Sequence, residues 1–555
     1  MSGLQAESNV ADGGRWGGWI AGLETVLLVL LFFVAAGDPP PAINEAHYLV
    51  LAKNFWQPDW CAGDLFVTSD KPHVLFHATF GALTQVCSLA TAAWVGRLIA
   101  WTMLAVALQS LTRSVCDRRF ASLAVAVIWI AGVEWFNLAG EWVIGGIEAK
   151  VPAYAFVVAA MTQMATGKWT RVWPLLGIAS AFHVLVGGWT VVAAMFAYAI
   201  AGRHRSPLAK QIMPLLLGGA IAMLGLWPAL RMSAATDPVD AIAAAKYYTY
   251  SRIAHHLMPS SFPAQWYVRH GVIVVVTFAA AWPLRRDRRF APLFWLAVGS
   301  CAIALGGLIL GMLPRFAPDL GAQLLRFYWF RATDSITPLT LGLAIAVCLR
   351  SESWLREPAR EPAAAAEDHA DDGQEPSGLR RASSLLIIGT AVALLGISTW
   401  RNLRYGIPVS TRFDTVTYRS QESIAAQQQA YRDWVAVCRW VDQSLPADEI
   451  LITPRHQYTF KWYAQRAEVV NWKDVPQDAD SLVQWYRRFF EIYPRRLGTV
   501  RVTIRYPELR RFREQYGARF MIVDRRVVGP NLPLVLVYPQ REAETNATYA
   551  VYRLP

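Results

Sequence analysis

Glu45 is the first residue of the chain whose type and position suggest chemistry. It lies in the stretch INEAHY, 43–48, a few residues after the first long apolar segment. A carboxylate beside a lipid-facing segment is costly to desolvate unless it is paired or used, which makes Glu45 a candidate for proton transfer. The alternative is an ordinary loop acid that stays solvated.

Four histidines, His47, His73, His77 and His183, are expected near the same side of the membrane segments. Histidines and acids are ligands of divalent cations, but none of these residues has the helical spacing of a histidine pair with a catalytic carboxylate. We therefore predict no metal ligand among them and expect mostly stacked or hydrogen-bonded structural rings. A divalent cation is left open as a cofactor.

The elements that must position these residues are membrane helices. The chain of 555 residues is 54% hydrophobic and 17% charged, with a mean hydropathy of +0.26. Apolar runs long enough to cross a hydrocarbon core recur throughout. The first run, 19–36, has Arg15 before it and no small-residue cleavage site after it, so we interpret it as a retained anchor. This composition excludes an ordinary soluble enzyme.

Apolar runs that alternate with basic loops predict about eleven membrane crossings. The predicted spans are 19–36, 92–112, 119–138, 143–165, 172–186, 188–202, 211–230, 270–284, 291–313, 323–349 and 384–400. The fifth and sixth are separated at Gly187-Gly188, because paired glycines weaken a helix. All strongly basic short loops then fall on one side, the cytoplasm by the positive-inside rule. We expect a multi-pass membrane protein with a cytoplasmic N terminus.

Composition divides the chain into four parts. They are a transmembrane domain, 1–350, with an outer loop at 37–73; a flexible cytoplasmic linker, 351–382; the last transmembrane helix, 383–400; and a soluble periplasmic domain, 401–555. The linker is predicted from its low hydrophobicity and many charges. Apolar residues at helical spacing between Tyr48 and Trp56 predict that the outer loop, 37–73, forms short helices lying along the outer membrane interface.

The C-terminal domain is predicted to have an α/β fold with a central sheet. Helical patterns alternate with short β-branched runs, which is typical of this class. The predicted helices are 418–444, 479–493 and 507–516, and the predicted strands are 450–452, 469–470, 520–523, 534–538 and 549–552. From residue 401 onward, 24 Lys and Arg stand against 16 Asp and Glu. This excess favours anionic partners such as lipid phosphates; nucleic acid is not expected on this side. A generic basic surface is the alternative.

The block 43–119 resembles the GT-C class of membrane glycosyltransferases, notably the aminoarabinose transferases and the protein O-mannosyltransferases. The first outer loop of that class opens with Asp-Glu, and here Asn44 stands in place of the first acid. The matching elements are NEAHYLVLAKNFW at 44–56, DKP at 70–72, GRL at 96–98 and a basic turn at 113–119. The resemblance implies a polytopic helical fold with a C-terminal α/β domain.

The resemblance also implies an activity and its partners. A sugar would pass from a polyprenyl-phosphate donor to a glycan, lipid or protein acceptor on the outer face of the membrane, with inversion. The leaving group would be a lipid phosphate, whose developing charge requires cations. Lys71 fits this role by resemblance, and Arg326 and Arg331 complete a predicted phosphate clamp. The alternative for the two arginines is anchoring at the lipid headgroups.

Other residues of the outer loop are expected at the substrate. His47, Tyr48 and His73 follow Glu45 in the loop and are predicted to contact the donor or the acceptor. The acceptor hydroxyl would need a base, and Glu45 is preferred. Two further carboxylates are candidates for the same role.

The first of these, Glu148, lies in GGIEAK, 145–150, about where the family has a second acid. Its alternative is a simple ion pair with Lys150. The second, Asp64, lies in GDLF, 63–66.

Two functions other than transfer stay open. Because Asn44 replaces an acid, the chain could be a non-catalytic relative that binds lipid-linked glycans. A transporter would show an inverted repeat of broken helices, and the sequence has no convincing one. The stretch 440–488 also resembles the C-terminal module of bacterial membrane proteins of uncertain activity. That second resemblance implies a bacterial source, and with it the bacterial inner (plasma) membrane, but no reaction.

Overall fold

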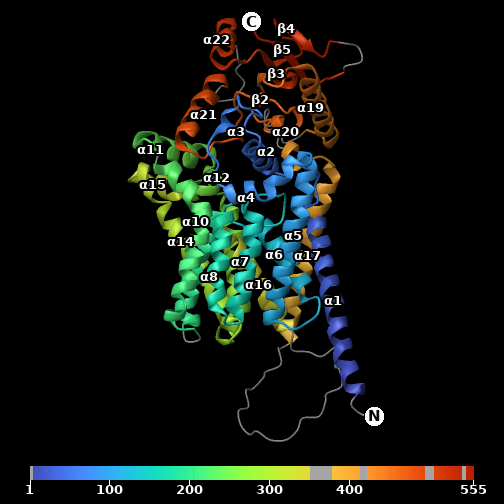
Figure 1. Ribbon diagram of the computed structural model, residues 1–555, viewed down its shortest axis with the longest axis vertical. Helices are drawn as coiled ribbons and strands as arrows, with labels where there is room; N and C mark the ends of the chain where they lie inside the picture. The colour runs from blue at the N-terminus through green and yellow to red at the C-terminus, as the bar shows by residue number, and fades with distance from the viewer. Residues whose placement is uncertain are drawn as a thin grey trace.

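The structure is a computed structural model that describes residues 4–203, 206–234, 236–349, 378–412, 422–493, 505–540 and 545–555. Figure 1 shows a bundle of long helices with a smaller C-terminal domain, residues 406–555, stacked on one end. The protein is therefore a polytopic helical membrane protein that carries a C-terminal α/β domain. Most of the predicted linker 351–382 lies outside the described residues.

Each of the predicted crossings corresponds to a helix of the bundle. These helices are α1 (Leu4–Ala36), α5 (Leu89–Val115), α6 (Ala121–Phe136), α7 (Lys150–Ala165), α8 (Trp169–Phe182), α9 (Val184–Ala197), α10 (Ile212–Ala234), α13 (Ala264–Ala281), α14 (Ala291–Leu310), α16 (Arg331–Cys348) and α17 (Gly378–Tyr405). Within the described ranges, 7 helices are long and apolar enough to cross a membrane. The other four predicted spans form α6, α7, α8 and α16, of 16, 16, 14 and 18 residues.

The predicted break at Gly187-Gly188 is wrong, because the chain breaks at His183 instead. His183 has an extended backbone, with φ −146° and ψ 101°, and its ring caps the first turn of α9. Gly187 lies inside α9, where a Cβ atom would come within 2.2 Å of the Ser180 backbone nitrogen. The glycine therefore permits α8 and α9 to pack closely.

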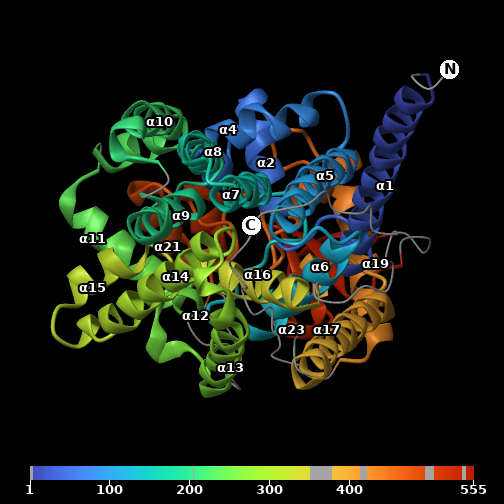
Figure 2. The same cartoon turned by 90° about the horizontal axis from the view of Figure 1, so that it is seen from below.

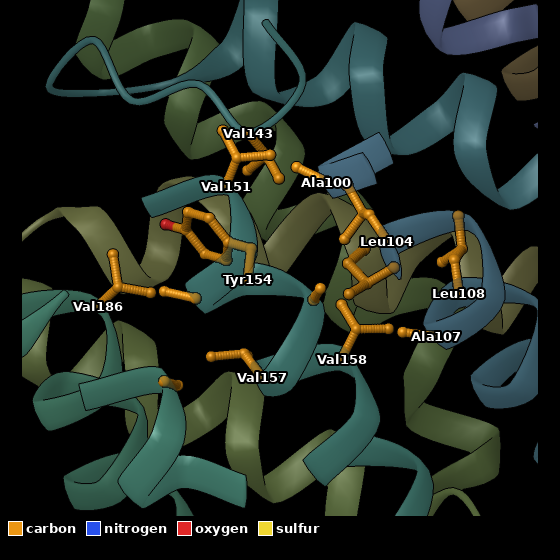
Figure 3. Packing of buried hydrophobic residues seen from close by; sticks show 14 of the residues in the cluster. Ala100, Leu104, Ala107, Leu108, Val143, Val151, Tyr154, Val157, Val158 and Val186 are labelled. Carbon is orange, nitrogen blue, oxygen red and sulfur yellow. The ribbon is translucent and has the colours of Figure 1, made fainter. Parts of the chain in front are cut away.

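Burial separates the inner helices from those at the edge. Seen from below, α7 lies inside the bundle, whereas α1, α10, α13 and α17 lie at its edge (Figure 2). Only 11% of the most apolar window of α10 is buried, against 50% for α5. Figure 3 shows Leu104 and Ala107 of α5 beside Val158 of α7. Small side chains allow such close contact, which stabilises helix pairs where lipid removes the hydrophobic driving force.

The predicted short helices of the outer loop are confirmed as α2 (Glu45–Trp56), α3 (Leu65–Thr68) and α4 (Val74–Ala78). Their surroundings differ from the lipid surface that the apolar pattern suggests, because α2 packs between α5 and helix α20 (Phe460–Ala464) of the C-terminal domain. Leu49, Val50 and Leu51 of α2 are buried. The loop therefore forms a layer between the bundle and the C-terminal domain.

The C-terminal domain contains a five-stranded mixed sheet of order β2-β1-β3-β5-β4. Strands β1 (Ile450–Ile452), β2 (Ala467–Glu468) and β3 (Phe520–Asp524) are parallel, and β5 (Tyr549–Arg553) runs antiparallel to β3 and to β4 (Val535–Tyr538). Helices α19 (Ile424–Ser444), α21 (Ala479–Ile492) and α22 (Tyr506–Tyr516) complete the domain. The order of elements matches the prediction, except that β2 pairs through 467–468 and not 469–470.

The remaining elements are short connections. They are α11 (Pro238–Lys246), α12 (Ala254–Leu257), α15 (Pro318–Leu325), α18 (Val409–Arg412), α23 (Arg525–Val528), the π-helices η2 (Tyr198–Gly202) and η4 (Tyr247–Arg252), and the 3-10 helices η1 (Phe80–Gln85), η3 (Leu208–Lys210), η5 (Pro259–Ser261), η6 (Trp282–Arg286) and η7 (Leu313–Arg315). Tyr247 of η4 stacks on Tyr486 of α21 at 3.7 Å between ring centroids, which ties this segment to the C-terminal domain.

Candidate functional site

Glu45 is enclosed in a buried ion pair. Arg97 of α5 donates to both of its carboxylate oxygens, from Nε at 2.6 Å and from Nη2 at 2.5 Å. The backbone N–H groups of Ala42 and Ile147 donate to the same oxygens at 2.7 Å each. Neither charged side chain is exposed. The Glu45 carboxylate is therefore fully engaged, and this geometry does not support the predicted role as a base.

Gly146 explains how the loop before α7 closes over this pair. A Cβ atom at Gly146 would lie 2.7 Å from the Glu45 Cδ atom, so only glycine fits there. The ion pair thus joins α2, α5 and the loop before α7. Asn44, which precedes Glu45, contacts a second group of charged side chains that includes Glu148.

That group is a buried cluster at the end of the bundle that faces the C-terminal domain. Asn44 Nδ2 donates to Glu148 Oε2 at 2.7 Å. Lys150 Nζ lies 3.0 Å from Glu148 Oε1 and 3.0 Å from Glu141 Oε1, and Arg331 Nε lies 2.6 Å from Glu141 Oε2. We call this group the central cluster: Asn44, Glu141, Glu148, Lys150, His183 and Arg331.

Two histidines and a tyrosine continue the central cluster into the outer loop. Arg331 Nη1 lies 3.0 Å from His183 Nε2, and the rings of His183 and His73 are 5.0 Å apart. His73 Nε2 lies 3.3 Å from the Tyr48 hydroxyl oxygen. Burial lowers the pKa of His73 to about 4, so its ring is neutral at pH 7. Burial and the nearby Glu148 charge raise the pKa of Tyr48, which keeps its hydroxyl protonated.

Two further cations lie near the central cluster, Lys473 of the C-terminal domain and Arg252 of η4. Arg252 of η4 donates to the carbonyl oxygens of Trp472, at 2.7 Å, and of Lys473, at 3.3 Å. Burial and the charge of Arg252 lower the pKa of Lys473 to about 8, against a weaker opposing effect of Glu148. Among the described residues, the four cations Lys150, Arg331, Lys473 and Arg252 thus stand against the three carboxylates Glu141, Glu148 and Asp474, an excess of positive charge suited to an anion.

A second buried cluster joins the outer loop to the C-terminal domain. Lys461 Nζ lies 3.0 Å from Asp64, 2.7 Å from Glu468 and 2.8 Å from Asp474, and all four side chains are at most 2% exposed. We call this group the anchor cluster: Asp64, Lys461, Glu468, Asn471 and Asp474. Asn471 donates to Glu468 and Asp474 at 2.7 and 2.8 Å. The cluster binds the loop and the domain into one unit.

Asp64, predicted as a catalytic acid, is a member of the anchor cluster. One of its oxygens caps α3 by accepting from the backbone N–H groups of Phe66 and Val67, and the other accepts from the backbone N–H of Glu468 at 3.1 Å. His47 lies at the edge of the cluster, with Nδ1 3.4 Å from Asp474. Burial lowers the pKa of His47, while Asp474 opposes this shift.

The predicted phosphate clamp is not assembled as three residues. Lys71 Nζ donates to the carbonyl oxygens of Val67, at 2.6 Å, and of Ser69, at 3.3 Å. Arg326 is exposed at the end of α15. Of the three, only Arg331 belongs to the central cluster, where its neighbouring cations are Lys150, Lys473 and Arg252.

No group of three His, Cys, Asp or Glu side chains within the described ranges is placed to hold a metal ion. The sequence pointed to Glu148 and Arg331, but Glu141 and Lys473 were missed as site residues. Glu141 had a usable signal, since it is an acid close to the end of a membrane segment. Lys473 had none beyond its neighbour Trp472, because its partners come from distant parts of the chain.

The comparisons with known proteins concern the whole chain and one short part of it. The crystal structure of ArnT from Cupriavidus metallidurans bound to undecaprenyl phosphate superimposes with a TM-score of 0.50 and 11% identity, over 97% of this chain and 98% of ArnT. The archaeal oligosaccharyltransferase AglB from Archaeoglobus fulgidus, in complex with an inhibitory peptide and a dolichol-phosphate, gives a TM-score of 0.48 and 12% identity over 92% of this chain and 70% of AglB. The match to ArnT, over nearly the whole of both chains, shows that the chain has a GT-C-like fold.

Residues 432–492 match a family described as a domain of unknown function (DUF6798). This match contains Lys461, Glu468, Asp474 and Lys473, and therefore the part of the C-terminal domain that faces the outer loop. No curated protein matches the chain.

Proposed function

We propose that the protein is an integral membrane glycosyltransferase that transfers a sugar from a polyprenyl-phosphate donor to an acceptor on the outer face of the membrane, with inversion. The observation that carries the proposal is the charge at the end of the GT-C-like bundle. The two cations of the central cluster balance its two carboxylates, and Lys473 and Arg252 beside it add the positive charge that an anionic lipid phosphate requires. The ArnT structure that resembles this chain holds undecaprenyl phosphate, which supports the same class of donor.

The reaction assigns the cations to the leaving group. The bond between the anomeric carbon and the phosphate oxygen breaks, the acceptor oxygen attacks the opposite face, and the lipid phosphate departs with its negative charge. Arg331, Lys150 and Lys473 would stabilise this charge, since charge-assisted hydrogen bonds strengthen as it develops. Arg252 would hold Lys473 in place through the carbonyl oxygen of that residue.

Glu148 is the base in this proposal. The acceptor hydroxyl loses its proton as the new bond forms, and a carboxylate at hydrogen-bond distance takes it. Asn44 occupies the position of the first acid of the family, and its amide contacts Glu148 at 2.7 Å. The Glu148 carboxylate, from the loop before α7, therefore lies next to the position at which the family has an acid in the outer loop. Lys150, whose Nζ lies 3.0 Å from Glu148, would stay beside this side chain when it becomes protonated.

The cellular arrangement is part of the proposal. With the basic short loops in the cytoplasm, the N terminus is cytoplasmic and the C-terminal domain lies in the periplasm of a bacterial inner membrane. The central cluster then faces the compartment in which lipid-linked sugars are used. Fusions of a periplasm-dependent reporter after Pro555 should be active, and fusions in the loop between α14 and α13 should be inactive; the reverse pattern would contradict this orientation.

Transfer itself is tested on purified full-length protein in nanodiscs with a panel of polyprenyl-phosphate sugars. We expect one donor to lose its sugar to an acceptor in wild-type protein, and Glu148→Gln to abolish this while it still binds the donor. Arg326→Ala, an exposed cation outside the central cluster, is the matched control. Failure of every donor to bind would contradict the proposal.

A second candidate is a non-catalytic protein that binds lipid-linked glycans. It is favoured by one observation, namely that Glu148 and Glu141 are both held in ion pairs with Lys150. In that case the donor would bind with an affinity that depends on Lys473, yet no sugar would be transferred or hydrolysed under any condition. The same panel of donors therefore separates the two candidates.

A further inference from the structure

A cavity of about 790 Å³ lies beside the central cluster, between the bundle and the C-terminal domain. Its walls come from the ends of α1 and α17, from α6, from the loop 137–146 and from α19. Figures 1 and 2 both place α17 and α19 next to each other on the α1 side of the molecule. This volume is in the range of sites for small molecules and lipid headgroups.

The walls change in character from one end of the cavity to the other. On the bundle side they are apolar, with Ala35 at the end of the first candidate membrane span and Ile130 and Val133 of α6. On the side of the C-terminal domain they are aromatic, with Tyr405 and Tyr431 half-buried. An amphiphile with a chain toward the bundle and a headgroup under the C-terminal domain matches both ends.

The charges of the cavity wall do not suit an anion. Arg401 is paired with Glu134 at 3.1 Å. Arg526 is paired with Asp524 at 2.5 Å and with Glu422 at 3.1 Å. Both arginines of the wall are therefore neutralised, in contrast to Lys473 and Arg252, which add positive charge beside the central cluster. A headgroup that donates hydrogen bonds to carboxylates without carrying negative charge is the better match.

Glu141 connects the cavity to the central cluster. It lines the cavity, and its carboxylate contacts Lys150 and Arg331 at 3.0 and 2.6 Å. Gly145 and Gly146, which also line the cavity, lie shortly before Glu148 in the chain. A headgroup in the cavity would therefore contact Glu141, which shares Lys150 with the proposed base Glu148, and the loop that leads to this base.

We propose that this cavity binds the acceptor, and that the acceptor is a lipid-anchored molecule with an uncharged, hydroxyl-rich headgroup, such as a neutral glycolipid. This inference rests on the proposed transfer reaction. Aromatic rings offer flat apolar faces to a sugar ring, and carboxylates accept from its hydroxyls. A hydroxyl of the headgroup would be the nucleophile; its oxygen joins the anomeric carbon of the donor sugar and its proton passes to Glu148.

Photo-crosslinking of full-length protein in phosphatidylcholine nanodiscs tests the site. The probe is dodecyl maltoside with a diazirine on the chain next to the sugar. We expect crosslinks at Tyr405 and on the α19 segment around Tyr431. Gln427→Trp, which fills the cavity from α19, should reduce labelling about tenfold, the loss of one pocket contact of ~1.4 kcal/mol. Trp400→Ala removes a 69% exposed aromatic from α17 outside the cavity and should leave labelling unchanged.

Competition defines the headgroup. Unlabelled dodecyl maltoside should displace the probe, and dodecyl phosphate at the same concentration should not. The proposal is overturned if dodecyl phosphate competes equally, or if labelling persists in both Gln427→Trp and Tyr431→Ala proteins with unchanged melting temperatures. It is also overturned if a hydroxyl-bearing peptide accepts the sugar at the same rate in wild-type and Gln427→Trp protein.

The two proposals fail in different ways. Donor binding and hydrolysis of the donor by water report on the central cluster and do not need the acceptor cavity. Labelling of the cavity by the maltoside needs no donor. Loss of labelling with intact donor hydrolysis would therefore overturn the acceptor site alone.

Discussion

The anchor cluster and the central cluster are both buried groups of charges, but their balance is opposite. In the anchor cluster one lysine faces three carboxylates, and the excess negative charge is met by hydrogen-bond donors such as Asn471 and the backbone of Glu468. In the central cluster two cations balance two carboxylates, and Lys473 and Arg252 beside it bring an excess of positive charge among the residues that the structure describes. A saturated group stabilises the fold, whereas an unbalanced one provides a place for a ligand.

The largest effect should come from removing the lysine of the anchor cluster. Lys461→Met leaves three buried carboxylates without a cation, which should lower the free energy of unfolding by about 3–5 kcal/mol. Thermal unfolding in detergent followed by circular dichroism measures this. Arg432→Met, an exposed cation on the neighbouring α19, is the control. Equal stability of the two variants would mean that the anchor cluster does not hold the domain.

The next largest effect is a loss of transfer rate that should distinguish Glu148 from Glu45. Glu148→Gln should lower the transfer rate by ~10²-fold or more with the fold intact, since the proton acceptor is lost. Glu45→Gln weakens the pair with Arg97 and should destabilise the protein, yet the rate per folded molecule should stay within about threefold of wild type. Rates normalised to the folded fraction decide. The reverse result would return the base to Glu45.

A smaller effect is expected from pH and Lys473. The pKa of Lys473 is lowered to about 8, so its ammonium is present below pH 8 and is lost above it. Donor affinity should therefore fall as pH rises from 7 to 9, by about tenfold at most for one site. Lys473→Arg stays charged and should bind equally well at pH 7 and 9. A pH profile of Lys473→Met as steep as that of wild type would assign the titration to another group.

The smallest effects are expected at the two cations outside the central cluster. Arg326 is exposed and Lys71 donates to backbone carbonyls of its own loop, so neither contacts the proposed phosphate site. Arg326→Ala and Lys71→Ala should each change donor affinity less than about twofold, within the range of a screened surface charge. Isothermal titration with a short-chain polyprenyl phosphate measures this. A tenfold loss in Lys71→Ala would restore the predicted clamp.

Much of the fold could be predicted because helices and strands leave local patterns. Hydropathy located every bundle helix, and alternating runs located the strands of the C-terminal domain. The break at His183 was misplaced to Gly187, because glycine can signal either a helix break or close packing and the sequence does not distinguish them. The site was only partly predictable for a different reason.

Partners in the site come from distant parts of the chain. Asp64 and Glu468 are 404 residues apart, and Asn44 and Glu148 are 104 apart. The motif in the outer loop points to Glu45 as a site residue, but it does not show that Arg97 donates to both of its carboxylate oxygens. Asp64 was predicted as a catalytic acid because the sequence does not show that its partner is Lys461, in a distant part of the chain. Long-range pairing, and not residue type, decided which acids are structural.

The hydrogen bond between Asp64 and the backbone of Glu468 also means that the outer loop completes its contacts only after the C-terminal domain has been synthesised. The outer loop is synthesised first. The partners of its Asp64 carboxylate, Lys461 and strand β2, are synthesised some 404 residues later. At about 5–20 residues per second, that delay is roughly 20–80 s. During this time the loop is without the domain that covers α2. A nascent chain stalled before residue 460 should therefore expose the loop to protease, and the completed chain should protect it.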